Sequence, residues 1–184
     1  MNTQKVVLVD KDDNKLGMSE VMSAHLGQGQ LHRAVSVLLF RFAGGEPEIL
    51  LQKRSSTKPL WPLYWTNTIC THPRDKETYA ACAIRRLKEE MGIEFPFNRL
   101  KFVYRLLYRA KYSDDLSENE LDSVFAGMWD GIPQINPKEA AGYRWERLDQ
   151  IKNAVKQNQL EVTPWFKLML KDSRIEKSLH QNKL

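Results

Sequence analysis

The chain lacks the features that mark membrane proteins and secreted proteins. No apolar run approaches the roughly 18 residues that a membrane-spanning helix needs, and the first residues do not pass from positive charge into an apolar stretch as a secretory signal does. Its 184 residues include only two cysteines, too few for a framework of disulfides. We therefore expect no membrane association, and we predict that the protein works in the reducing cytoplasm.

A concentrated basic segment is also missing. The chain has 28 lysines and arginines and 23 aspartates and glutamates, a net charge of +5, and the two signs are interspersed. Nucleic-acid-binding segments usually carry a block of basic residues, so we expect no nucleic acid partner. A charge excess of this size fits a local anion site instead. With 42% hydrophobic residues and no low-complexity tract or internal repeat, residues 1–184 are predicted to form a single globular domain.

The hydrophobic pattern predicts strands of mixed direction covered by helices. Strands are expected where apolar residues alternate or run continuously between turn residues, and helices where apolar residues recur three or four apart. This combination favours an α+β protein, an α/β/α sandwich with a mixed sheet. Apart from the segment described next, the predicted strands are residues 5–10, 15–17, 31–42, 48–53, 100–112, 123–131 and 142–145, and the predicted helices are residues 148–159 and 164–180.

A segment in the middle of the chain combines an extended stretch, a loop and a helix. The β-branched residues of 65–73 lead into Pro73, which disfavours helix at the residue before it. The helix follows at once. Asp75 and Thr78 are both candidate N-caps, and Gly92 suits the position just after the last turn. The sequence therefore predicts a helix that starts close behind a loop and ends at a glycine.

This helix carries residues at the spacing of a known motif. Seven of nine positions follow G-x5-E-x7-R-E-U-x-E-E-x-G-U, so the segment resembles the Nudix box, in which glutamates hold divalent cations against a diphosphate. Thr71 stands in place of the first glycine, and Arg86 in place of the first helix glutamate. An arginine cannot coordinate a metal, but it can bind a phosphate bidentately. The matching positions are Glu77, Arg85, Leu87, Glu89, Glu90, Gly92 and Ile93.

Three histidines and two glutamates predict a metal site of another kind. His25 and His32 flank a glycine-containing loop, and His72 follows a cysteine by two residues. Glu118 and Glu120 are also two apart, so on a strand both carboxylates would point to one face. A mixture of imidazole and carboxylate suits manganese, zinc or iron better than an ion that prefers oxygen alone.

Taken together, these residues closely resemble the type I isopentenyl diphosphate isomerases. The resemblance implies a Nudix-like α/β/α fold and the conversion of isopentenyl diphosphate to dimethylallyl diphosphate, by protonation and deprotonation through a carbocation-like state. One departure is Val21, which stands where many bacterial members carry a lysine. The resemblance covers residues 24–25, 31–32, 53–62, 65–73, 85–92, 108–110, 118–120 and 163–165.

The resemblance also implies which residues carry out the reaction. The groups that exchange protons with the substrate would be Cys70 and Glu120, on opposite faces of the hydrocarbon. Tyr108 would hydrogen-bond Glu120, and the ring of Trp165 would face the cationic state. Neighbouring arginines are expected to lower the pKa of the Cys70 thiol, and metal coordination that of Glu120. The phosphates would be bound by Arg54, Lys58 and Arg86.

Two metal ions follow from the same resemblance. Magnesium would lie between Glu90, the main chain of Cys70 and the substrate diphosphate. The other divalent ion, manganese or zinc, would be held by His25, His32, His72, Glu118 and Glu120. Because water would capture a carbocation, we also expect the N-terminal segment or the C-terminal helix to close over the pocket.

Two other functions compete with this interpretation. A Nudix hydrolase acting on a nucleoside diphosphate derivative would share the motif and the fold, although Arg86 argues against it. A metal-binding or nucleic-acid-binding module without catalytic activity could also keep the scaffold. Individually, Cys70 could be a buried apolar residue, His32 a core histidine and Trp165 a core aromatic; their joint occurrence at matching spacings favours the isomerase.

Overall fold

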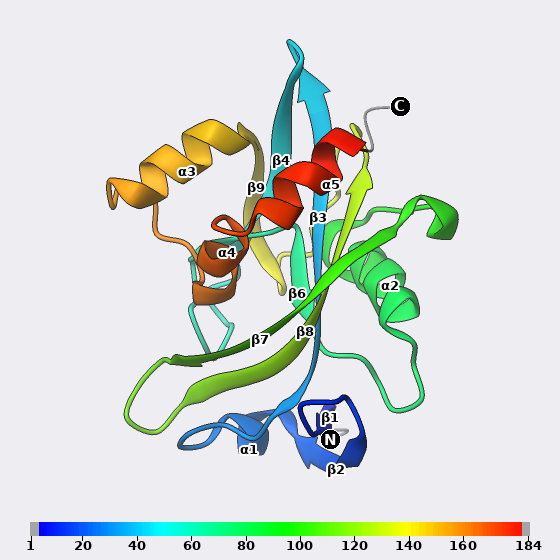
Figure 1. The fold of residues 1–184 in the computed structure, drawn as a ribbon. Helices are drawn as coiled ribbons and strands as arrows, with labels where there is room; N and C mark the ends of the chain where they lie inside the picture. The colour runs from blue at the N-terminus through cyan, green and yellow to red at the C-terminus, as the bar shows by residue number, and fades with distance from the viewer. Residues whose placement is uncertain (1–3, 182–184) are drawn as a thin grey trace.

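The computed structural model describes residues 4–181, and its strands form one mixed sheet (Figure 1). The central strand β3 pairs antiparallel with β1, β4 and β6 and parallel with β8, while β7 extends the sheet beyond β8 and β9 pairs with β4. The strands are β1(Lys5–Val9), β2(Lys15–Glu20), β3(His32–Ala43), β4(Glu46–Arg54), β5(Trp65–Thr66), β6(Ile69–Thr71), β7(Lys101–Lys111), β8(Ser117–Met128) and β9(Ala140–Arg147).

Helices cover the sheet from both sides. In Figure 1, α2 lies on one side, and α3, α4 and α5 lie on the other. No helix within residues 4–181 is both long enough and apolar enough to cross a membrane. The helices are α1(Val21–His25), α2(Tyr79–Met91), the 3-10 turn η1(Phe97–Arg99), α3(Leu148–Lys156), α4(Pro164–Met169) and α5(Ser173–Gln181). The predicted α+β class and mixed sheet are confirmed.

The apolar run of β3 is continuous because both of its faces are buried. Val37 and Leu39 pack with α2, whereas Leu38 and Phe40 pack with α3, α4 and α5. Successive side chains on a strand point to opposite faces, so a strand between two helical layers needs apolar residues at every position. The long run therefore marks the centre of the sandwich.

The ends of α2 follow from two local signals. The Thr78 hydroxyl accepts a hydrogen bond from the Ala81 amide, which makes Thr78, rather than Asp75, the N-cap. Gly92 ends the helix with a φ of 65°, a conformation that side chains disfavour. A Cβ at Gly92 would also lie 2.5 Å from the carbonyl oxygen of Gln134, so this position has no room for one. The helix that carries the motif is thus fixed at both ends.

Two predicted elements were wrong in extent. The strand expected at 123–131 is β8, which begins at Ser117 and brings Glu118 and Glu120 into the sheet. The helix expected at 164–180 is two helices, α4 and α5, because the chain turns at residues 170–172. Leu168 of α4 is 41% exposed, whereas Ile175 and Leu179 of α5 are buried, so the two helices do not form one continuous apolar stripe.

Candidate active site

A cavity of about 240 Å³ lies where α1, β6, β8 and α4 meet. Most of the candidate site residues line it, although they come from distant parts of the sequence. His32, Tyr108 and Glu90 do not line it but hydrogen-bond residues that do. The candidates that line the cavity are His25, Arg54, Lys58, Cys70, His72, Arg86, Glu118, Glu120 and Trp165.

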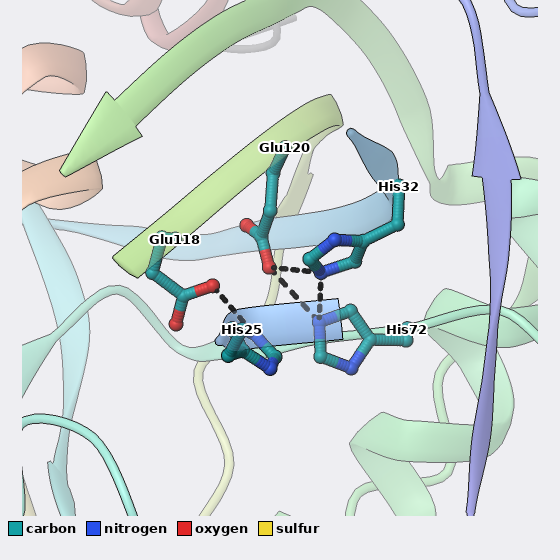
Figure 2. A group of neighbouring side chains, drawn as sticks. All are labelled: His25, His32, His72, Glu118 and Glu120. Carbon is teal, nitrogen blue, oxygen red and sulfur yellow. Dashed lines mark hydrogen bonds and ion pairs between the residues drawn. The ribbon is translucent and has the colours of Figure 1, made fainter. Parts of the chain in front are cut away.

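The five predicted metal ligands converge on one point (Figure 2). One ligand atom from each lies within 4.8 Å of all the others. Four segments supply them: α1, the start of β3, the loop after β6, and β8, whose two glutamates lie on one face as predicted. Bonds of about 2.1 Å would place opposite ligands about 4.2 Å apart, so the spacing fits a single ion with little rearrangement. The residues are His25, His32, His72, Glu118 and Glu120.

Main-chain carbonyls orient two of the imidazoles. Nδ1 of His25 lies 2.6 Å from the carbonyl oxygen of Val21, and Nδ1 of His32 lies 2.7 Å from that of Gln30. A carbonyl only accepts hydrogen bonds, so Nδ1 carries a proton in each ring, and Nε2 is the atom that faces the centre and can bind a metal when it holds no proton. Imidazoles that bind metals are commonly held in this way.

The charge of the cluster also fits a divalent cation. Burial lowers the pKa of His72 to about 4, despite the hydrogen bond to Glu120, and so keeps this imidazole neutral. Burial opposes a charge on His25 as well, but the hydrogen bond and charge of Glu118 outweigh it and raise the pKa of His25 to about 9. The two carboxylates therefore attract positive charge even into a buried position. Neutral imidazoles with two carboxylates would balance one divalent ion.

The surroundings of Cys70 and Glu120, the two expected proton carriers, shift their pKa values in opposite directions. Burial, reinforced by Glu120 and Asp122, raises the pKa of the Cys70 thiol well above its ordinary value. The expectation that arginines would lower it was wrong, because carboxylates are the charges that act on it. Burial also opposes a charge on Glu120, but hydrogen bonds from His32 and His72 outweigh it and lower its pKa. Carriers whose pKa values are pushed apart are typical of acid–base pairs.

Trp165 forms part of the cavity wall, and Tyr108 lies behind Glu120. The Tyr108 hydroxyl donates to Oε2 of Glu120 at 2.5 Å. Trp165 is buried, and its Nε1 donates to Thr66 Oγ1 at 3.0 Å and Asn67 Oδ1 at 3.1 Å, which fix the ring. The guanidinium of Arg54 lies 5.2 Å from the centre of that ring, so the ring already attracts a cation.

The three predicted phosphate ligands lie together, with a carboxylate that the sequence interpretation missed. Lys58 forms an ion pair with Glu139, and Arg86 Nη2 lies 3.0 Å from the other oxygen of the same carboxylate. Arg54 instead donates to the main-chain carbonyls of Leu60 and Trp61. The cations are therefore held in place before any phosphate binds.

Glu90 is almost fully buried and carries two polar partners. Arg86, one turn earlier on α2, donates to its Oε1 through Nε at 3.0 Å and Nη2 at 2.8 Å. Gln52 Nε2 donates to the other oxygen at 3.0 Å. Hydrogen bonds to both oxygens therefore fix the orientation of this carboxylate beside Arg86, one of the predicted phosphate ligands.

Glu139, Gln52, Ser36 and Asp122 are site residues that sequence reasoning missed. Glu139 is a lone acidic residue before β9, Gln52 is a polar residue that directly follows the apolar run of β4, and Ser36 is a small polar residue inside the apolar run of β3. Asp122 follows Glu118 and Glu120 at the same spacing of two, and this alternation was the one signal that could have revealed it.

Comparison with known proteins agrees with this geometry. The NUDIX domain family model matches residues 30–166. A Photorhabdus laumondii protein named isopentenyl-diphosphate Delta-isomerase 1 is 37% identical over 89% of this chain and 91% of its own length. A Serratia proteamaculans protein named isopentenyl-diphosphate Delta-isomerase is 38% identical over 92% of this chain and 90% of its own length. An Aromatoleum aromaticum protein named isopentenyl-diphosphate Delta-isomerase 1 is 44% identical over 77% of this chain and 76% of its own length.

Solved structures of much lower identity share the fold. A Deinococcus radiodurans protein superposes with a TM-score of 0.70 at 17% identity, over 91% of this chain and 98% of that one. A Nudix hydrolase from Alicyclobacillus acidocaldarius superposes with a TM-score of 0.63 at 12% identity, over 77% and 90%. The fold is therefore common to proteins of different activity, whereas the sequence similarity is specific. By the family model and the sequence similarity, the chain belongs to the Nudix family and, within it, to the isopentenyl-diphosphate Delta-isomerases.

Proposed function

We propose that this protein converts isopentenyl diphosphate to dimethylallyl diphosphate. The observation that carries the proposal is the meeting, in one cavity, of a thiol, a carboxylate in a cluster of metal-ligand type, and a group of cations. Cys70 and Glu120 line the same cavity as Arg54, Lys58 and Arg86. A small diphosphate could therefore bind its charged end at one side and present its hydrocarbon to the proton carriers.

The reaction moves a double bond, so one proton must be added and another removed. A proton joins the terminal CH₂ carbon of the double bond, the adjacent carbon becomes cationic, and the next carbon loses a proton to form the new double bond. Cys70 and Glu120 would act as donor and acceptor, and Tyr108 would orient Glu120 through its hydrogen bond. The ring of Trp165 would stabilise the cation.

Two divalent ions are expected to take part. The cluster of three imidazoles and two carboxylates would hold manganese or zinc, which suit mixed nitrogen and oxygen donors. Magnesium would bind Glu90 and the diphosphate, because it commonly reaches a protein through one or two carboxylates plus substrate phosphates. The ions would supply charge that keeps Glu120 ionised and binds the diphosphate.

The pocket wall suggests what closes over the substrate. Gln4, just before β1, lines the cavity together with Val21 and Met22 of α1, and Trp165 of α4 lines it from the other side. We propose that the N-terminal segment is the cover, because it also supplies the ligand His25. Since Val21 has no charge, the phosphate contact of the lysine found in relatives would be supplied by other cations. We further propose that residues 1–184 act as one domain, in the cytoplasm, where both thiols stay free.

Hydrolysis of a nucleoside diphosphate derivative is the competing function. It is favoured by the Nudix domain alone, and it is opposed by Arg86, which occupies a metal-ligand position of the motif and pairs with Glu90 and Glu139. The test supplies isopentenyl diphosphate with magnesium and manganese in heavy water. Isomerisation puts deuterium on carbon, whereas hydrolysis releases phosphate and labels no carbon. Binding to polynucleotides without turnover would indicate the non-catalytic module instead.

Replacement of Cys70 tests the role of the thiol. Cys70→Ala should lower turnover by roughly 10²- to 10⁴-fold, since it removes a proton carrier. Cys82→Ala is the matched control, because Cys82 is the other cysteine, is buried on the opposite side of the sheet, and does not line the cavity. Equal turnover by the two variants would contradict the proposal.

A further inference from the structure

Glu139 is a carboxylate among the cations of the cavity, and the proposed reaction gives it no part. Its Oε2 forms an ion pair with the Lys58 ammonium, and its Oε1 accepts a hydrogen bond from Arg86 Nη2 at 3.0 Å. Burial opposes the charge of Glu139, but the two cations outweigh burial and lower its pKa, so the group is ionised. An anion among groups that bind phosphate weakens their attraction for a diphosphate, so the presence of Glu139 needs another explanation.

The main chain around Glu139 joins the two segments that carry these cations. Its carbonyl oxygen accepts a hydrogen bond at 3.0 Å from the Ser55 amide, in the loop after β4 that holds Lys58. Its amide donates at 2.9 Å to the carbonyl oxygen of Asn136, whose own amide donates at 2.9 Å to the carbonyl oxygen of Glu90, in the last turn of α2. This turn is therefore attached to both the loop and the helix, and it fixes the place from which the carboxylate extends.

The two cations depend on Glu139 to different degrees. Arg86 also donates to Glu90 through Nε and Nη2, so a second carboxylate holds its guanidinium. The Lys58 ammonium has no other hydrogen bond or ion pair among residues 4–181. Lysine carries its charge on a flexible four-carbon stem, and the charge is strongly hydrated. Without Glu139, the Lys58 ammonium would turn toward water.

We propose that Glu139 is a positioning residue that holds the Lys58 ammonium beside Arg86, in the place where the diphosphate binds. The inference rests on the proposed function, since the diphosphate is the charged end of the proposed substrate. An ammonium has three N–H donors, and Glu139 takes one of them, so two remain for phosphate oxygens. A long side chain that is already fixed loses less conformational freedom when the anion arrives, and binding is tighter for that reason.

The binding test shortens the carboxylate and keeps its charge. Glu139→Asp lacks one methylene, and because the turn fixes its main chain, it should not reach Lys58. Calorimetry with inorganic pyrophosphate and magnesium should show a Kd raised roughly three- to tenfold. Glu48→Asp is the matched control: the Glu48 side chain is 17% exposed against 23% for Glu139, it also pairs with an arginine, and it does not line the cavity. Its Kd should equal that of the unmodified protein.

A double-mutant cycle tests whether Glu139 acts through Lys58. Lys58→Met removes the ammonium and keeps an unbranched side chain. Adding Glu139→Asp to Lys58→Met should then change the Kd of pyrophosphate by less than about twofold, because no ammonium is left to position. A purely structural role would give the same three- to tenfold loss in both backgrounds. In turnover, Glu139→Asp should raise KM by the factor seen in Kd and leave kcat within about twofold, since only diphosphate binding is weakened.

The outcomes distinguish this inference from the proposed function. An unchanged Kd in Glu139→Asp, or equal losses with and without Lys58, would overturn the positioning role and leave an active isomerase standing. An unmodified protein that bound no pyrophosphate would overturn it as well. A protein that shows the expected pattern of Kd values but puts no deuterium into isopentenyl diphosphate would refute the proposed function, and Glu139 would then position Lys58 for another diphosphate.

Discussion

Replacing Asp13 by asparagine is expected to destabilise the whole protein, because Asp13 fastens the β1–β2 hairpin to three other elements. Its Oδ1 accepts from Arg33 Nε at 2.7 Å and from the Tyr79 hydroxyl at 2.6 Å, and its Oδ2 accepts from Arg105 Nη2 at 2.8 Å. Arg33 also donates to the main-chain oxygen of Asp13. The hairpin continues into α1, which carries His25, so this attachment also positions one wall of the cavity.

The magnitude follows from what asparagine keeps and loses. Asp13 has a φ of 71°, a conformation that asparagine tolerates nearly as well, so the backbone should not change. The amide oxygen can still accept from Arg33 and Tyr79, but without charge, and the amide nitrogen faces Arg105, which is also a donor. The Asp13 side chain is 12% exposed and that of Arg105 44%, so solvent screens the outer contact. Together these losses amount to about 2 kcal/mol, or about 4–8 °C in Tm for a chain of this length.

Equilibrium urea unfolding followed by tryptophan fluorescence measures the change. The midpoint should fall with an unchanged slope, because the same surface is exposed on unfolding. Asp12→Asn is the control: it removes the same charge from the neighbouring residue, whose exposed side chain makes no hydrogen bond or ion pair among residues 4–181. It should shift stability by less than about 0.5 kcal/mol. If the two variants were equally stable, the attachment through Asp13 would be refuted.

Four further predictions concern the site and α2. Glu120→Gln should lower kcat by roughly 10²- to 10⁴-fold, because an amide cannot carry the proton. Arg86→Glu should raise KM, since a phosphate ligand becomes an anion; a variant that gained hydrolysis and kept full substrate affinity would show that Arg86 has another role. His25→Ala should lose its transition metal, measured by elemental analysis, with activity falling in parallel, and retention of metal would argue against the five-ligand centre. Gly92→Ala should destabilise the protein by about 1–3 kcal/mol in urea unfolding, because its φ of 65° and the Gln134 oxygen 2.5 Å from an added Cβ leave no room for a side chain.

The sequence predicted well those helices and strands whose apolar pattern and end-capping residues match the way they are buried in the structure. The central strand was predicted because both of its faces are apolar, and α2 because Thr78 and Gly92 mark its ends. The start of β8 was missed because its alternating acidic residues face the cavity, and acidic residues usually indicate a solvated loop. The break between α4 and α5 had a usable signal in Asp172, whose carboxylate accepts from the Arg174 amide at the start of α5.

The sequence predicted the candidate metal ligands of the site, but it did not predict the residues that hold the other site residues in place. Histidines and glutamates at matching spacings indicated the cluster, and the structure brings all five together. Glu139 lies 81 residues from Lys58 and 53 from Arg86, so no local pattern could link them. Ser36 and Asp122 are joined only by the register of β3 with its neighbours. Contacts of this kind depend on strand pairing, which single residues in a sequence do not reveal.

The arginines of α2 explain why a Nudix motif need not imply a Nudix hydrolase. Arg85 donates to both oxygens of Glu77 and also pairs with Glu89, while Arg86 pairs with Glu90. Each carboxylate of the motif thus has an arginine partner, and of these motif residues it is Arg86, a cation, that lines the cavity. Apart from Glu139, the carboxylates that line the cavity are Glu118 and Glu120 of β8, beside the imidazoles. The carboxylates without an arginine or lysine partner therefore lie where a cation would form in the proposed isomerisation, and not where the phosphates are proposed to bind and hydrolysis would need metal ions.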